Sequence, residues 1–84
     1  MGTKNDPGDY DCHAKALPDE PKFTLLARDP DFHRLVMKWA RRRSQDVQCG
    51  LRPASDMEMV AEARSCAFAG REWRKNNNGK WRAE

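Results

Sequence analysis

The side chains in this sequence that are best suited to chemistry are three cysteines and two histidines: Cys12, His13, His33, Cys49 and Cys66. Structural zinc sites use closely spaced ligand pairs such as Cys-x-x-Cys or His-x-x-x-His, and the sequence has neither spacing. A cysteine nucleophile needs a base, which His13 or His33 could supply for Cys12. No glycine-rich phosphate cradle or recognised pair of catalytic carboxylates accompanies them. We therefore expect no enzymatic activity, catalytic residue, cofactor or metal site, with a zinc-stabilised domain as an alternative.

Basic side chains gather in two runs, Arg41–Arg43 and the stretch REWRKNNNGKWR at residues 71–82. Such runs can contact nucleic-acid phosphates, and Trp81 could stack on a base. The alternative is a solvated helix end, because cationic side chains stabilise the negative end of a helix dipole. The predicted basic surface consists of Arg41, Arg42, Arg43, Arg71, Arg74, Lys75, Lys80 and Arg82.

Length and composition limit the scaffold that can position these side chains. The 84 residues are 38% hydrophobic and 35% charged, which allows one domain with a small core. Small scaffolds usually need disulfides, a metal or a second copy of themselves. The odd, irregularly spaced cysteines do not form a disulfide framework, and no signal peptide or membrane-spanning stretch is recognisable. We therefore expect a cytoplasmic protein that forms a homodimer.

The charge is unevenly distributed along the chain. Residues 1–31 contain four Lys/Arg and seven Asp/Glu, a net charge of −3, whereas residues 32–84 contain twelve and six, a net charge of +6. The acidic first part and the basic second part could attract each other within one chain or between subunits. The basic part could also face an acidic partner.

The breaker residues divide the chain into three parts. Residues 1–11 are expected to form a flexible N-terminal tail, residues 12–79 a single helical-hairpin domain with an extended arm, and residues 80–84 a C-terminal tail. At the start of the domain, two prolines limit residues 12–21 to a short helical turn.

A strand-like run covers residues 22–28 (KFTLLAR), with Phe23 and Leu25 on one face. A lone strand leaves its backbone donors and acceptors without partners. The run could therefore pair with residues 80–82 or with its copy in another subunit. Otherwise it is an extended segment that lies over the helices.

The first long helix is expected to begin at Asp29, which can cap it, with Pro30 in the first helical position. It is expected to end at Arg41–Arg43, after roughly 15 residues. Its apolar stripe consists of Phe32, Leu35, Val36, Trp39 and Ala40.

The second helix is expected to begin at the capping box formed by Ser55 and Glu58, and to end at residues 76–79 after roughly 20 residues. One face of this helix carries Met59, Val60, Ala63, Cys66, Ala67, Gly70 and Trp73. The predicted fold is mainly α, a helical hairpin with a minor β element or extended arm, completed by homodimerisation.

A second apolar face is expected on the same helix, since Met57, Ala61 and Phe68 lie nearly opposite the first. A helix with two apolar faces usually contacts two neighbours. We therefore interpret these residues, with Phe23 and Leu25, as a dimer or partner interface. The alternative is that the arm covers Phe68 within the same chain.

The stretch YDCHAKALPDEPKFTLLARDP, followed by the tryptophan-containing FHRLVMKWARRR, resembles a group of short phage and prophage proteins. In that group a D-C-x-x-K-A-x-P-D-E-P-x-F-x-L-L-A-R-D segment precedes two helices. The resemblance covers residues 10–75 and departs at His13, where an aromatic residue is expected. It transfers no catalytic residues.

Among small phage proteins the chain is most similar to anti-CRISPR proteins directed at type I CRISPR–Cas effector complexes. The resemblance implies a non-enzymatic inhibitor that acts in the bacterial host cell and blocks target-DNA engagement by the complex. Because the chain is net basic, DNA mimicry is disfavoured. Either the basic helices dock on an acidic protein surface or guide RNA, or the acidic arm occupies a DNA-binding groove. The alternative function is a small basic DNA- or RNA-binding phage regulator.

Overall fold

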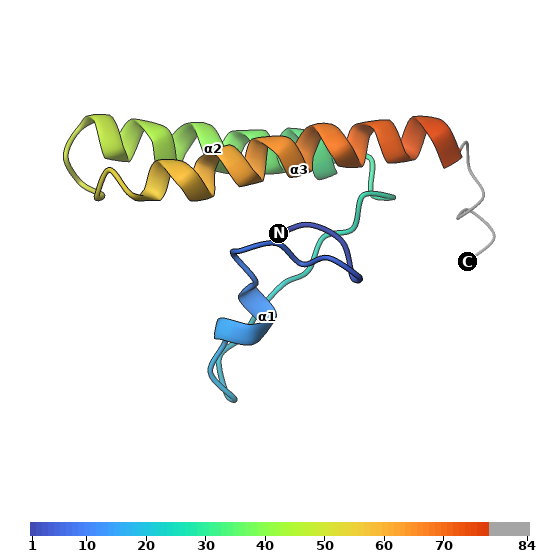
Figure 1. Ribbon diagram of the computed structural model, residues 1–84, viewed down its shortest axis with the longest axis horizontal. Coiled ribbons are helices and arrows are strands. Elements are labelled where there is room, and N and C mark those ends of the chain that lie inside the picture. Colours follow the sequence, from blue (N-terminus) through green and yellow to red (C-terminus); the bar gives the residue numbers. More distant parts are fainter. Residues whose placement is uncertain (78–84) are drawn as a thin grey trace.

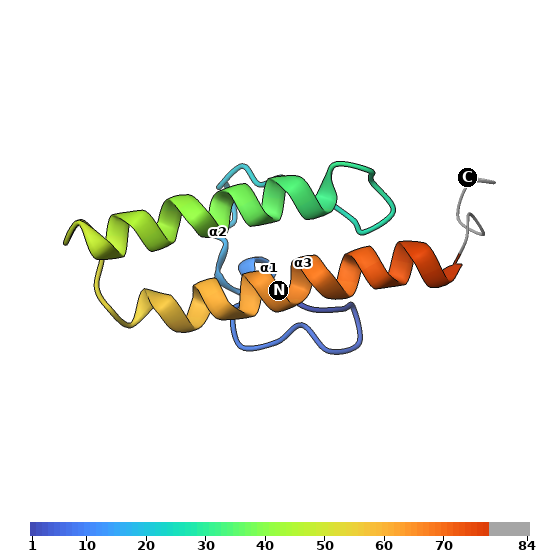
Figure 2. The ribbon, with the colours of Figure 1, turned by 90° about the horizontal axis from the view of Figure 1, so that it is seen from above.

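Two antiparallel helices form the body of the protein in this computed structural model, which describes residues 1–77. The helices α2 (Phe32–Gln48) and α3 (Asp56–Asn77) lie side by side and are joined by residues 49–55 (Figure 1; Figure 2). A four-residue helix, α1 (Cys12–Lys15), belongs to the segment that precedes them. We call residues 9–31 of this segment the arm. No strand forms within the described residues, which confirms the prediction of a mainly α fold.

The start of α2 lies two residues later than we predicted. The Asp29 carboxylate accepts a hydrogen bond from the N–H of Asp31 (2.8 Å), and the Asp29 carbonyl accepts one from the N–H of Phe32 (3.0 Å). Asp29 and Pro30 therefore form a turn that leads into the helix, and Asp31 takes the cap position.

The end of α2 was predicted too early, at Arg41–Arg43, because the helix continues to Gln48. Ser44 is buried and Val47 is half-buried, so the face that begins with Phe32 persists for another turn. The helix stops at Gly50, whose φ of +79° is the left-handed conformation that favours glycine after a helix.

The start of α3 at Asp56 follows Ser55 directly, as the capping-box pattern predicted. The N–H of Glu58 donates a hydrogen bond to the Ser55 carbonyl (3.3 Å). Within the described residues the helix runs to Asn77, and the remainder of its predicted end, residues 78–79, lies outside them.

The core lies along the seam between α2 and α3 and consists mostly of small side chains. Ala40 of α2 packs against Val60 and Ala63 of α3, with Val36 and Met1 at the border of this cluster. Small residues allow the two helices to approach closely, but each one buries little area. The buried hydrophobic residues are Phe32, Ala40, Val60, Ala63 and Ala67.

Three large residues of the predicted apolar stripes are not buried. Leu35, Trp39 and Trp73 are 38% to 40% exposed, although each lies on a face that we expected to be covered. In a two-helix hairpin each helix has one helical neighbour, which covers only the side chains that point at it. The flanks of a wide apolar stripe therefore remain in contact with solvent.

The predicted N-terminal tail folds back against α3. The N–H of Asp9 donates a hydrogen bond to the Glu62 carboxylate (2.9 Å), and the hydroxyl of Tyr10 donates one to Glu58 (3.4 Å). Gly8 has a φ of +77°, and a Cβ at this position would lie 2.7 Å from Oε1 of Glu62. The tightest contact of such a Cβ would be with the backbone carbonyl of Met1, so the positive φ and the fold of residues 1–8 back on themselves favour glycine here.

From this attachment the arm extends away from the hairpin, with α1 near its outer end (Figure 1). After α1 the chain turns between Leu17 and Glu20, where the Glu20 N–H donates to the Leu17 carbonyl (3.0 Å). Residues 21–26 then return toward α2 without regular secondary structure. Residues 22–28 are thus a non-strand segment, and the suggested partner strand at residues 80–82 lies outside the described residues.

Candidate interaction surfaces

The outer flank of α3 carries a continuous stripe of exposed residues. Their spacing alternates between four and three residues, which places all of them on one side of the helix. The stripe combines apolar side chains with cations, and each of its members is exposed. We call it the α3 stripe, and it consists of Met57, Ala61, Arg64, Phe68, Arg71 and Lys75.

Met57, Ala61 and Phe68 were predicted to share this flank, whereas Arg64 was not predicted to belong to the same surface. The four–three spacing would have identified it. Phe68 is 52% exposed, so the arm does not cover it in this chain. The ring of His33 from α2 contacts it edge-on, with ring centroids 5.1 Å apart.

His33 joins the two helices at this point. Its Nδ1 lies 3.0 Å from the carbonyl oxygen of Ala67, and because a carbonyl can only accept, Nδ1 carries the hydrogen. The imidazole is half-buried and packs against Phe68, so it links α2 to α3.

A second exposed stripe runs along the outer side of α2. Arg34, Lys38 and Arg41 are separated by four and three residues, and all three are exposed. Together with His33 and Met37 they line a shallow hollow on this helix. We call Arg34, Lys38 and Arg41 the α2 basic stripe. Of these residues, only Arg41 belongs to the basic surface predicted from the sequence.

The predicted run Arg41–Arg43 does not act as one unit. Arg43 lies between the helices, 3.4 Å from the Asp56 carboxylate and with its guanidinium 5.0 Å from the centre of the Trp39 ring. Arg42 is exposed and lies 3.6 Å from Asp46 on the next turn. Arg43 therefore stabilises the hairpin, and Arg41 remains directed toward solvent.

The second predicted basic run lies at the other end of the hairpin. Arg71 and Lys75 are exposed near the end of α3, where α3 lies beside Phe32, the first residue of α2. Arg41 lies nine residues further along α2, or about 14 Å from Phe32 at a rise of 1.5 Å per residue. The two runs therefore do not form a single patch. Lys80, Trp81 and Arg82 lie outside the described residues.

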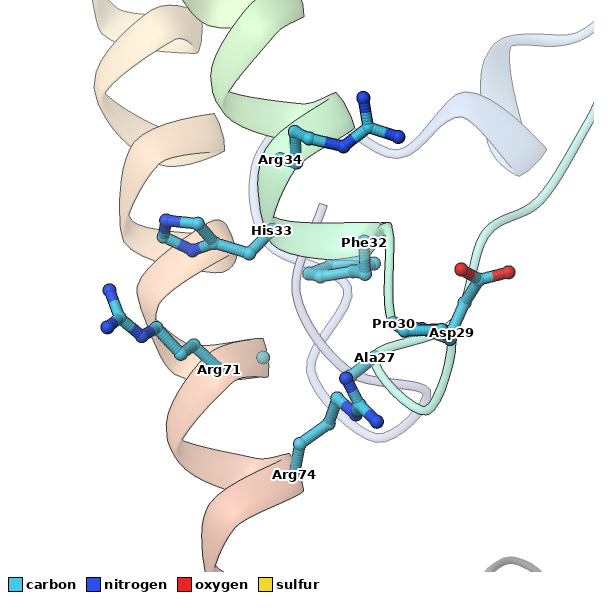
Figure 3. Close-up of a pocket in the computed structure, with 9 residues that line it drawn as sticks. Ala27, Asp29, Pro30, Phe32, His33, Arg34, Arg71 and Arg74 are labelled. Atoms are coloured by element: carbon cyan, nitrogen blue, oxygen red, sulfur yellow. The ribbon is translucent and has the colours of Figure 1, made fainter.

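A hollow of about 270 Å³ opens where the start of α2 meets the end of α3. Figure 3 shows that Arg74 extends toward the turn at Ala27 and Asp29, whereas Arg71 extends beside His33 and Arg34 points away on the far side of α2. The three guanidinium groups do not converge on one point. The hollow is lined by Ala27, Asp29, Pro30, Phe32, His33, Arg34, Gly70, Arg71 and Arg74.

The arm separates Phe23 from Leu25, which we had predicted to share one face. Phe23 is 87% exposed, whereas Leu25 is half-buried, as is Ala27 near Gly70. Among residues 1–77 no partner strand imposes alternation on this segment. The chain also bends where the Asp29 N–H donates to the Leu26 carbonyl (2.9 Å). Exposed Leu17 and Leu26 accompany Phe23 on the arm, and no periodic pattern in the sequence predicts their exposure.

The cysteines and histidines considered for metal binding are spread over α1, α2, the loop after α2, and α3. Among residues 1–77 no three His, Cys, Asp or Glu side chains gather in a way that could hold a metal ion. Cys12 and Cys49 are exposed free thiols, and Cys66 is half-buried on α3. His13 contacts the Lys22 amine across the two limbs of the arm.

Tyr10 has a pKa above its ordinary value. Desolvation raises the pKa of the Tyr10 phenol above 10.0, and the nearby charge and hydrogen bond of Glu58 raise it further. Tyr10 also contacts the Lys15 amine, which lies 5.1 Å from its ring centre. These interactions link the start of the arm to α3.

Comparison of the chain with protein-family models, with curated proteins and with solved structures found no match. None of the helices within residues 1–77 is long and apolar enough to cross a membrane. The function must therefore be inferred from the surfaces of the chain itself.

Proposed function

We propose that this protein is a non-enzymatic binding module that inhibits a host defence system, specifically an anti-CRISPR protein that blocks target-DNA engagement by a type I CRISPR–Cas surveillance complex. One observation carries the binding role: within residues 1–77, nine large apolar side chains are at least 36% exposed, whereas five hydrophobic residues are buried. Leu35 and Trp39 lie one turn apart on α2, and Met57 and Phe68 share the α3 stripe, so part of this surface is grouped, which is typical of interaction sites.

The more specific assignment is supported by the sequence resemblance over residues 10–75. The part of the chain that carries this resemblance, from Tyr10 through the PDEP segment to α2, includes the projecting arm and the first helix of the hairpin. A projecting arm on a small helical scaffold suits an inhibitor that blocks a large complex by contact.

For the contact with the complex we favour the α2 basic stripe. Arg34, Lys38 and Arg41 form an exposed row of cations on the outer side of the hairpin, and the chain as a whole has a net charge of +3. A cationic row attracts an acidic protein surface and steers the encounter. DNA mimicry would instead require a dense anionic surface, which the described helices do not present.

The test uses the purified surveillance complex and labelled target duplex. The protein, added before the DNA, is expected to abolish the mobility shift that target binding produces. The variant Arg34→Glu/Lys38→Glu is expected to require at least about tenfold more protein for the same inhibition. Arg52→Glu, which changes an exposed arginine in the loop between the helices, serves as the control and should inhibit like the wild type.

An unchanged mobility shift at saturating wild-type protein would overturn the anti-CRISPR proposal. Pulldown of the tagged protein from a host lysate provides a second readout. Recovery of CRISPR effector subunits supports the proposal, whereas recovery of nucleic acid alone favours the alternative.

The alternative is a small DNA- or RNA-binding regulator, and the same α2 basic stripe favours it, because cations spaced along one helix side can contact successive phosphates. Retention on non-specific duplex DNA at increasing salt separates the two functions. With about three phosphate contacts, the logarithm of the binding constant should fall with a slope of roughly −3 against the logarithm of salt concentration. A protein-directed inhibitor is expected to show no retention at moderate salt.

A further inference from the structure

The projecting arm and the α3 stripe lie on different sides of the same hairpin, and each leaves apolar side chains exposed. We propose that the protein forms a two-fold homodimer in which the arm of each copy packs on the α3 stripe of the other. The occupant of the stripe is thus residues 17–23 of a second copy.

The two surfaces match in chemistry and in order. Along α3 the order is apolar Met57, cationic Arg64 and apolar Phe68, with Arg71 one turn further on. Along the arm, apolar Leu17 and Phe23 flank the carboxylates of residues 19–20 (Asp-Glu), all of them exposed. Each surface therefore offers two apolar contacts with charged side chains between them. The arm segment also contains Lys22, so its two carboxylates leave it with a net charge of −1, opposite in sign to Arg64 and Arg71.

The dimensions of the two surfaces agree. Met57 and Phe68 are separated by eleven residues of helix, or about 16 Å at 1.5 Å per residue. Leu17 and Phe23 are separated by six residues, which span at most about 20 Å when extended. The turn after Leu17 shortens that span toward the spacing on α3.

The tip of the arm is ordered before it binds. Pro18 occupies the second position of the turn from Leu17 to Glu20, where its restricted φ favours a turn. The N–H of Leu17 donates to the Glu20 carboxylate (3.0 Å), and His13 contacts the Lys22 amine across the arm. A segment with this much internal bonding loses little conformational entropy when it docks.

The arm does not cover the stripe of its own chain. Its first end is bonded to Glu58 and Glu62, and its second end turns directly into α2 at Asp29. Glu62 and Phe68 are about 120° apart around α3, at 100° per residue. With both ends held on the other flank, the tip is presented outward, where a second copy can receive it.

The charge distribution favours this pairing over a parallel arrangement of two copies. Residues 1–31 have a net charge of −3 and residues 32–84 a net charge of +6, so arm-to-helix contact brings opposite charges together. Because each copy contributes one arm and one stripe, a two-fold axis satisfies both and the assembly closes.

Light scattering on the full chain tests the proposal, with an expected mass of twice the 9.7 kDa of one chain. Phe23→Ser and Phe68→Ser are each expected to raise the dissociation constant of the dimer at least about tenfold. Leu51→Ser removes an exposed apolar side chain from the loop between the helices and is the matched control. It should leave the dissociation constant unchanged.

Charge exchange provides a rescue experiment. Arg64→Glu/Arg71→Glu should weaken the dimer, and addition of Asp19→Lys/Glu20→Lys to the same chain should restore it, which a merely destabilised fold would not do. If Phe68→Ser loses its helical circular dichroism, Phe23→Ser still tests the dimer, because the Phe23 side chain lies outside the packed hairpin and its loss should not unfold the chain.

Two results would overturn the dimer: a wild type that keeps the mass of one chain at high concentration, or a dimer whose dissociation constant is unaffected by Phe23→Ser and by Phe68→Ser. The outcome is separable from the proposed function. A monomeric protein that still inhibits the surveillance complex would contradict only the dimer proposal. A dimeric protein without inhibitory activity would contradict only the anti-CRISPR proposal.

Discussion

The ring of Phe32 lies directly on the backbone of Gly70, where the start of α2 crosses the later part of α3. A Cβ on Gly70 would lie 2.8 Å from Cδ2 of Phe32 and 3.3 Å from the Cβ of Ala27. Phe32 is the one large aromatic residue in the buried set of the described chain, so this contact closes the open end of the hairpin.

We predict that Gly70→Ala lowers the free energy of unfolding by about 1–3 kcal/mol, because the added methyl group displaces the Phe32 ring. This loss should exceed the gain of about 1 kcal/mol that alanine brings over glycine within a helix. Urea unfolding followed by circular dichroism measures the change. Combining the substitution with Phe32→Leu should recover part of the loss, and a Gly70→Ala protein more stable than wild type would contradict the contact.

The second prediction concerns Glu62, which accepts the Asp9 N–H and holds the first segment on α3. Glu62→Ala should lower the free energy of unfolding by about 1 kcal/mol through loss of this hydrogen bond. Hydrogen exchange at the Asp9 amide should accelerate as well. Glu72→Ala, an exposed position on the same helix, is the control and should change neither quantity.

The third prediction distinguishes two neighbouring arginines. Arg43→Ala should cost about 1 kcal/mol, because its side chain is only 20% exposed and interacts with both Asp56 and Trp39. Arg42→Ala should cost less than about 0.5 kcal/mol, since its pairing with Asp46 is exposed to solvent. Thermal or urea unfolding of the two variants under the same conditions tests the order, and equal losses would contradict it.

The fourth prediction concerns pH. The pKa of Tyr10 is raised in the folded protein, so the protonated phenol is favoured there. The stability that it contributes is fully present below pH 10 and is lost as the pH rises through the folded-state pKa. Tyr10 is the single tyrosine of the chain, so alkaline titration of tyrosinate absorbance reports it directly.

In that titration the wild-type midpoint should lie above the value for an unfolded peptide of about 10. Glu58→Gln should move it back toward 10, because both the charge and the carboxylate acceptor are removed. An identical midpoint in the two proteins would show that Tyr10 and Glu58 are not in contact.

Much of the hairpin could be predicted from local pattern. Val60, Ala63, Ala67 and Gly70 repeat at helical spacing, and all four are buried against α2. The start of α3 followed from Ser55 because capping is a local interaction. These features depend on residues that lie within one or two turns of one another, and sequence periodicity reports such interactions directly.

The path of the arm could not be predicted in the same way. The hydrogen bond from Asp9 to Glu62 joins residues 53 positions apart and depends on a surface that exists only after the hairpin has formed. Arg43 was assigned to the basic surface for a similar reason. Its neighbours in sequence are exposed cations, and only the packing of α3 brings Asp56 beside it.

Among the candidate surface residues, Met57, Ala61 and Phe68 could be placed correctly on one exposed flank because the four–three spacing is local. Leu25 could not, since its position depends on where the chain bends before α2.

The connection between α2 and α3 has a consequence for the order in which the chain folds. Residues 49–55 join the helices closely, so contacts near this loop form at little entropic cost and the hairpin can close progressively from it. The arm can attach only after α2 and α3 have paired, because its hydrogen bond from Asp9 to Glu62 joins residues 53 positions apart. It should therefore be the last part to become ordered and the first to detach on mild denaturation, while the two long helices are still paired.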